Sequence, residues 1–139
     1  MSSSPNGELK QPANRVVLDA SAILALLYRE TGDDVVAAAL NGAAVSTVNV
    51  AEVLSKLADT GMPVAEMREA IDDLGLTIVP FDVDLSYAVG LLRPATKGQG
   101  LSLSDRACLA LARRLGVPAL TADQAWKGVS VGVDIQVVR

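Results

Sequence analysis

The sequence predicts a single α/β domain in which a parallel sheet of about five strands is covered by helices on both faces. Two observations indicate this fold class. Short apolar runs of strand length alternate along the chain with longer segments of helical length, which is typical of parallel sheets. The chain also has 139 residues, half of them apolar, which suffices for one core built mainly from Val, Leu, Ile and Ala.

Each element is predicted from a local pattern. The short apolar run within 15–18 suits a strand buried on both faces. Gly116 and Pro118 stop the helix before them, and Pro63 favours a helix start. Residues 1–14 are expected to be a mobile tail in front of a domain spanning 15–139. We expect strands at 15–18, 43–46, 76–81, 119–121 and 135–138, helices at 20–28, 32–40, 47–58, 63–74, 82–92 and 104–115, and a loop at 95–100.

The composition excludes several classes of protein. The chain has no histidine, which rules out Ser-His and Cys-His nucleophilic sites and nearly all zinc sites. It has neither a long uncharged apolar run nor a secretory signal at its start, so we expect no membrane association. The single cysteine, Cys108, favours a reducing, cytoplasmic location. The net charge of −4 opposes unspecific attraction to nucleic acid, so a nuclease would need bound divalent cations.

Acidic residues follow two of the predicted strands. Asp19 comes directly after the first strand, and Asp123 comes two residues after Thr121 in the fourth. Ligands of open parallel sheets bind at the carboxyl ends of the strands, so both acids are expected at one edge of the sheet. Asp19 also lies between two apolar segments, where an acid is costly to bury without a partner. This pattern favours a functional role for Asp19.

Two further acids are candidates for the same site. Helical spacing puts Glu52 at the border of the apolar face of the third predicted helix, with Asn49 farther out. Asp105 is in the first turn of an otherwise apolar helix. Each acid alone also has an ordinary interpretation: Glu52 as a solvated helix residue, Asp105 as part of a capping box with Ser102, and Asp123 as a turn residue or N-cap. The apolar face of the third helix is expected to comprise Val50, Ala51, Leu54, Leu57 and Ala58.

The four acids in their order resemble a known family. The segments are VVLDASAILALL around Asp19, VNVAEVLSKL around Glu52, LSLSDRACLALARRLGVP around Asp105 and LTADQAW around Asp123. Together they resemble the PIN domain, and more closely the VapC toxins of type II toxin–antitoxin pairs. The resemblance covers residues 15–139 and implies a PIN-like fold.

The resemblance implies a magnesium-dependent endoribonuclease that cuts structured RNA such as tRNA or rRNA and so inhibits translation. It also implies a homodimer that a VapB-type antitoxin neutralises. The four acids carry over as the catalytic, metal-holding set for Mg²⁺, with Mn²⁺ as a substitute ion. Ser21, Asn49 and Thr121 carry over as supporting residues. Some family members have a further acid after the fourth, whereas Gln124 stands at that position here.

The chemistry of these residues agrees with that expectation. Mg²⁺ prefers oxygen ligands and keeps several waters, so a few carboxylates suffice to hold it. A bound metal ion makes a water nucleophilic, which replaces the missing histidine base. We expect Asp19 and Asp105 to be direct ligands, and Glu52 to orient the attacking water or a second ion. Asp123 is expected to be a ligand or to support one.

Two other functions compete with this one. The same fold could be a catalytically weak module that only binds RNA or a partner, although the presence of all four acids opposes this. A receiver-type phosphoacceptor also uses acids at strand ends, but it needs paired acids near the first strand and a lysine after the last, and neither is found.

For a toxin, we expect a groove lined by 20–28 and 47–58 to hold an amphipathic antitoxin segment, with an antitoxin Arg or Lys entering the acidic site.

Overall fold

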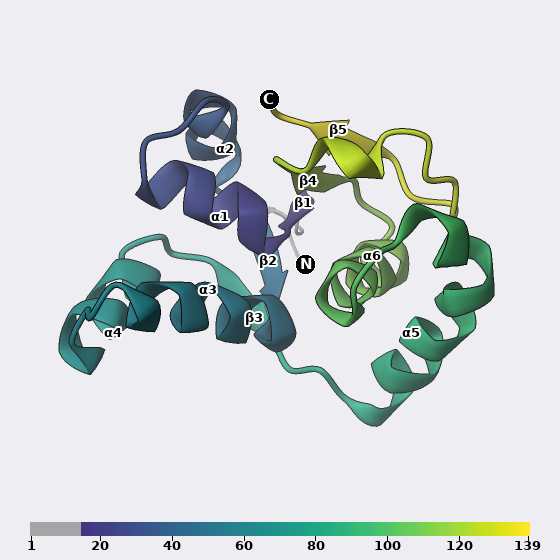
Figure 1. Ribbon diagram of the computed structural model, residues 1–139, viewed down its shortest axis with the longest axis horizontal. Helices are drawn as coiled ribbons and strands as arrows, with labels where there is room; N and C mark the ends of the chain where they lie inside the picture. The colour runs from purple at the N-terminus through teal and green to yellow at the C-terminus, as the bar shows by residue number, and fades with distance from the viewer. Residues whose placement is uncertain (1–14) are drawn as a thin grey trace, which may run out of the picture.

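Five short strands form one sheet in which every neighbouring pair is parallel. The computed structural model describes residues 15–139, and the tail expected at 1–14 lies outside them. Figure 1 shows the sheet running through the middle of the molecule, in the strand order β3-β2-β1-β4-β5. The predicted fold class is confirmed. The strands are β1 (Val16–Leu18), β2 (Ala43–Ser46), β3 (Thr77–Val79), β4 (Ala119–Thr121) and β5 (Ile135–Val137).

Helices cover both faces of this sheet (Figure 1). Strand side chains alternate between two apolar clusters, so Val17 and Ala119 pack toward α5 and α6, while Leu18 and Leu120 pack toward α1 to α4. None of the helices within 15–139 is long and apolar enough to cross a membrane. One face carries α1 (Ala20–Leu27), α2 (Asp33–Ala39), α3 (Thr47–Asp59) and α4 (Val64–Asp72), and the other carries α5 (Val83–Thr96) and α6 (Leu103–Leu115). Short 3-10 turns are η1 (Lys97–Gln99) and η2 (Gln124–Trp126).

The structure corrects two details of the sequence analysis. The fifth helix does not stop before Pro94 but continues to Thr96. Proline removes the hydrogen bond to the carbonyl four residues earlier, here that of Gly90, and this is tolerated because Gly90 is exposed and its carbonyl can bind water. The predicted apolar face of α3 is also wrong in part, because Ala51 and Ala58 are exposed. The buried residues of α3 are Asn49, Val53 and Leu57.

The strand order reverses direction beside β1. The chain runs outward from β1 through β2 to β3, and then returns across the sheet to place β4 against the other side of β1. In the register of this pair, Val17 is opposite Ala119 and Leu18 is opposite Leu120. Parallel sheets bind ligands at the carboxyl ends of strands where such a reversal occurs. The fold therefore directs attention to the residues that follow β1 and β4.

Candidate metal centre and active site

Asp19 is the buried centre of the candidate site. It follows β1 directly, is only 2% exposed, and caps α1 by accepting a hydrogen bond from the Ala22 amide at 2.8 Å. The Ser21 hydroxyl lies 2.8 and 2.9 Å from its two carboxylate oxygens, and the Thr121 hydroxyl donates to Oδ2 at 2.6 Å. Burial raises the pKa of Asp19 to about 6, against the lowering effect of these hydrogen bonds, and the charge of Asp105 adds to the rise.

Hydrogen bonds connect the ends of β1 and β4. The Ser21 hydroxyl accepts a hydrogen bond from the Ala122 amide at 2.9 Å and lies 3.1 Å from the Thr121 hydroxyl. Thr121 Oγ1 in turn accepts from the Asp123 amide at 3.0 Å. These bonds hold Asp19 in one orientation, because Ser21 and Thr121 are themselves fixed by the backbone after β4. The structure thus places both residues against Asp19, where the resemblance assigned them a supporting role.

Glu52 and Asp105 reach the same edge from two helices. Glu52 lies on α3, and its Oε1 accepts a hydrogen bond of 2.6 Å from the Ser104 hydroxyl in the first turn of α6. Asp105 is half-buried and forms a capping box with Ser102: its amide donates to Ser102 Oγ at 3.2 Å, and its Oδ2 accepts from the Ser102 amide at 2.9 Å. The capping interpretation of Asp105 is therefore correct, and it coexists with a position beside the other acids.

Asn49 is a buried polar residue on α3, three positions before Glu52. It is 1% exposed, so its expected outward position on α3 is wrong. Its Nδ2 donates to the Ser104 carbonyl at 3.0 Å, while its Oδ1 has no hydrogen-bond partner among residues 15–139. Asn49 and Glu52 both hold Ser104, one through its carbonyl and one through its hydroxyl. They therefore fix the first turn of α6 against α3.

The acids of the site interact electrostatically, and none of the four forms an ion pair within residues 15–139. Burial raises the pKa of Asp105, and the charges of Asp123 and Glu52 raise it further, against the hydrogen bonds from Ser102. The two ion pairs within 15–139 lie elsewhere: Arg114 with Asp82 at 3.0 Å, and Arg139 with Glu30 at 2.9 Å. Like charges brought together without compensation are the electrostatic setting of a cation site.

The donor chemistry fits a hard cation, but the side chains do not close around one. No three of the Asp, Glu or Cys side chains in 15–139 are placed so that they could together hold a metal ion. Asp123 is exposed and its Oδ1 accepts from the Ala125 amide at 2.9 Å, which caps η2, while Asp105 is engaged in its capping box. All four acids nevertheless offer carboxylate oxygens, and waters, which Mg²⁺ keeps in several positions, could supply the remaining ligands.

Comparison with protein families decides the identity of this fold. The model of the PIN domain matches residues 16–131, a range that includes all four acids. The chain belongs to the PIN-domain family. PIN domains are generally nucleases. A comparison with curated protein sequences gives no match.

Several solved structures have the same fold as this PIN domain. A toxin–antitoxin complex from Klebsiella pneumoniae aligns with a TM-score of 0.65 at 17% identity, over 86% of this chain and 99% of that chain. VapBC2 from Rickettsia felis, bound to a DNA fragment from their promoter, aligns with a TM-score of 0.68 at 16% identity, over 89% and 98%. VapBC-5 from Mycobacterium tuberculosis aligns with a TM-score of 0.55 at 17% identity, over 91% of this chain and 98% of that chain. Such low identities show a shared fold.

Sequence reasoning missed one residue of the site. Ser104 contacts both Glu52 and Asn49, yet serine in a first helical turn is common and signals nothing by itself. Its partners are more than fifty positions away in sequence, so only the packing of α6 against α3 reveals it.

Proposed function

We propose that this PIN domain is a magnesium-dependent endoribonuclease, the cytoplasmic toxin of a type II toxin–antitoxin system, which cuts structured RNA such as tRNA or rRNA and so inhibits translation. The observation that carries the proposal is the set Asp19, Glu52, Asp105 and Asp123. At the strand reversal of a PIN domain, the charge of Asp105 raises the pKa of Asp19, and the charges of Glu52 and Asp123 raise the pKa of Asp105. None of the four acids is ion-paired within residues 15–139.

The residues of the chain have distinct tasks in such a site. Bound Mg²⁺, or Mn²⁺ in its place, would supply charge neutralisation at the phosphate and a nucleophilic water at neutral pH. Asp19 and Asp105 are the proposed ligands. One oxygen of Glu52 is held by Ser104, which leaves the other free to orient the attacking water and to take its proton. Asp123, on the exposed side, is proposed to complete the shell through water.

An antitoxin of the VapB type is the proposed regulator. The structures that align with this chain include toxin–antitoxin complexes, which supports such a partner. An apolar hollow of about 430 Å³ lies between α3 and α4, and it suits the apolar face of an amphipathic segment. We therefore place the antitoxin on α3 and α4, because charged and polar side chains, among them Glu30, Lys56 and Arg139, interrupt the apolar lining of the hollow between α1 and α3. The apolar residues around the α3–α4 hollow are Val50, Leu54, Val64, Met67, Ile71 and Ile78.

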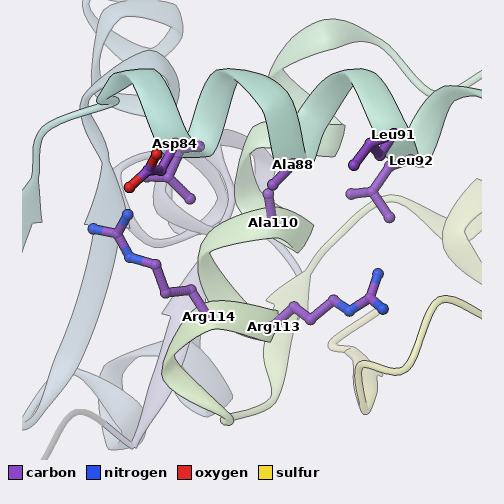
Figure 2. A pocket seen from close by; sticks show the side chains of 8 residues that line it. Asp84, Ala88, Leu91, Leu92, Ala110, Arg113 and Arg114 are labelled. Carbon is purple, nitrogen blue, oxygen red and sulfur yellow. The ribbon is translucent and has the colours of Figure 1, made fainter.

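A homodimer is proposed to form through α5. Val83, Tyr87 and Leu91, one helical turn apart, are 71%, 71% and 79% exposed and form an apolar stripe. A groove of about 320 Å³ lies between α5 and α6. In Figure 2, Leu91 and Asp84 lie toward its two ends. Two antiparallel α5 helices related by a two-fold axis would set Val83 of one copy opposite Leu91 of the other, with Tyr87 at the centre, so the stripe is complementary to itself. Leu91→Glu should then give a monomer in light scattering.

The decisive test combines cleavage in vitro with sequencing of RNA ends after induced expression. With Mg²⁺ the protein should cut RNA at defined positions, and EDTA should stop cleavage. Asp105→Asn should remove the same ends from cells, whereas Asp59→Asn, an exposed acid at the end of α3, should leave them unchanged. Cleavage that persists equally in EDTA and in Asp105→Asn would refute the proposal.

One observation favours a second candidate, a catalytically weak module that binds RNA or a partner. Within residues 15–139 no three acids are closed around a common metal position. RNA binding without Mg²⁺-dependent cleavage, unchanged in Asp105→Asn, would support this alternative.

A further inference from the structure

A hollow of about 640 Å³ with several charged and polar lining residues opens directly beside the acid cluster. Three segments distant in sequence form its walls: α1 with Tyr28 at its end, α3 with Lys56, and the residues after β4 with Asp123. Ser21, which hydrogen-bonds Asp19, lines it as well. The hollow is therefore continuous with the candidate site.

Helical spacing on α1 and α3 leads from the acids into the hollow. Lys56 follows Glu52 by four residues on α3, so both side chains lie on one side of that helix. Tyr28 follows Ser21 by seven residues on α1, which corresponds to about 10 Å along the helix axis. A ligand that reaches from the acids to Tyr28 must therefore extend beyond the group bound at the acids.

The chemistry of these walls is that of a single-strand nucleic-acid site. Tyr28 is 44% exposed, in a chain with only four aromatic residues, two Tyr, one Phe and one Trp. Exposed aromatic rings beside cations bind single strands by stacking on bases and contacting phosphates. Lys56 is exposed and has no ion-pair partner among residues 15–139, whereas Arg139 is paired with Glu30 at the rim.

We propose that this hollow binds the nucleotide next to the scissile phosphate, with its base stacked on Tyr28 and a phosphate held by Lys56. The inference rests on the proposed ribonuclease function and adds a substrate subsite to it. It also explains how an acidic protein approaches RNA. The net charge of −4 does not attract RNA to the protein as a whole, but Lys56 provides a local positive charge that binds the strand. The ring of Tyr28 stacks on any base, so the subsite selects an unpaired nucleotide rather than a particular sequence.

A peptide partner fits this hollow less well than RNA does. An amphipathic segment needs a continuous apolar lining, and here only Leu24 and Ala122 provide one beside Tyr28. The remaining walls are polar or charged. The apolar hollow between α3 and α4 is the better surface for a peptide.

The test measures binding and cleavage of a fluorescein-labelled single-stranded RNA of mixed sequence in Mg²⁺. Binding is followed by anisotropy in the Asp105→Asn background, where we expect cleavage to be lost, and cleavage is followed in the protein that carries Asp105. Tyr28→Ala should raise Kd and KM about tenfold with kcat within about twofold, while Tyr28→Phe, which keeps the ring, should behave like the parent. Lys56→Gln should reduce the slope of log Kd against log salt by about 0.7, the value for one phosphate contact with a single strand.

Lys97→Gln, at an exposed lysine on η1, is the matched control and should leave KM unchanged. If the unchanged protein does not cleave RNA at all, the proposed function itself fails. If it cleaves but Tyr28→Ala and Lys56→Gln bind and cleave like the parent, the subsite is refuted and the ribonuclease stands. Weaker binding of an antitoxin peptide with unchanged RNA binding would overturn the subsite in favour of a peptide site.

Discussion

The two sides of the acid cluster are held in different ways. On the strand side, Asp19 is 2% exposed and receives hydrogen bonds from Ser21, Ala22 and Thr121. On the helix side, Glu52 and Asp105 are half-buried, and the bonds that hold them come from the first turn of α6. The strand side depends on the sheet itself, while the helix side depends on how α6 is capped.

This difference separates two requirements of the proposed metal site. Asp19 is preorganised at the cost of desolvation, which its raised pKa of about 6 expresses. Asp105 is less buried, and a helix cap already occupies one of its oxygens. In the proposed metal site, Asp19 on the strand side is therefore the fixed ligand, and the acids on the helix side are those that would have to adjust to a bound ion.

The largest expected effect is on cleavage when an acid of either side is neutralised. Asp19→Asn and Asp105→Asn should each lower kcat/KM by about 100-fold or more, because a hard cation loses a charged ligand. Circular dichroism should show an intact fold in both variants. Near-parental cleavage by Asp105→Asn alone would mean that only the strand side holds the metal.

A second expected effect distinguishes the sides by pH, without metal. Between about pH 4 and 6 the folded protein keeps a proton on Asp19 that an unfolded Asp has lost, so the free energy of unfolding should fall as pH rises through this window, by roughly 2–3 kcal/mol. Urea denaturation at several pH values measures it. Acids with a lowered pKa, such as Asp82, change the free energy of unfolding in the opposite direction. The free energy of unfolding is therefore measured for the parent and for Asp19→Asn at each pH, and the difference between the two proteins is assigned to Asp19. Parallel pH curves for the two proteins would contradict the raised pKa.

A smaller effect is expected from the hydroxyl groups that support each side. Thr121→Val removes the 2.6 Å donor to Asp19, so kcat/KM should fall about tenfold and the rise of cleavage with pH should move upward. Ser104→Ala frees Glu52 and should lower kcat about threefold at unchanged KM. Ser55→Ala, at an exposed hydroxyl on α3, is the control and should have no effect. Equal losses in Thr121→Val and Ser104→Ala would remove the proposed difference between the sides.

The smallest expected effect is on thermal stability. Mg²⁺ at about ten times its dissociation constant should raise the parental Tm by about 5 °C, because it binds the folded state. Without metal, Asp19→Asn should melt at the same temperature or higher, since a desolvated charge is removed, and Mg²⁺ should then stabilise it less. Equal shifts by Mg²⁺ in both proteins would show that the ion binds elsewhere.

Much of the fold and the position of the acids could be predicted from local patterns. Apolar runs and caps predicted most elements to within a few residues. Asp19 and Asp123 were predicted because ligands of parallel sheets bind at the carboxyl ends of the strands. The burial of Asn49 could not be predicted, because its amide is satisfied in part by the Ser104 carbonyl on another helix. The continuation of α5 through Pro94 depended on Gly90 being exposed. Both wrong predictions depend on contacts or exposure in the folded protein, and the spacing of residues along a helix gives no information about these.

The bond between Thr121 and Asp19 spans 102 positions of the chain, and β1 pairs with β4 across a similar separation. Contacts so distant in sequence form late and slowly during folding, since most of the chain must be ordered to bring the strands together. On the ribosome, where proteins are made from the N-terminus onward, Asp19 emerges early but stays without Thr121 until β4 has been synthesised. A nascent chain that ends before β4 therefore contains Asp19 without the hydroxyl of Thr121 that holds it, and the site is completed only after β4 has been synthesised.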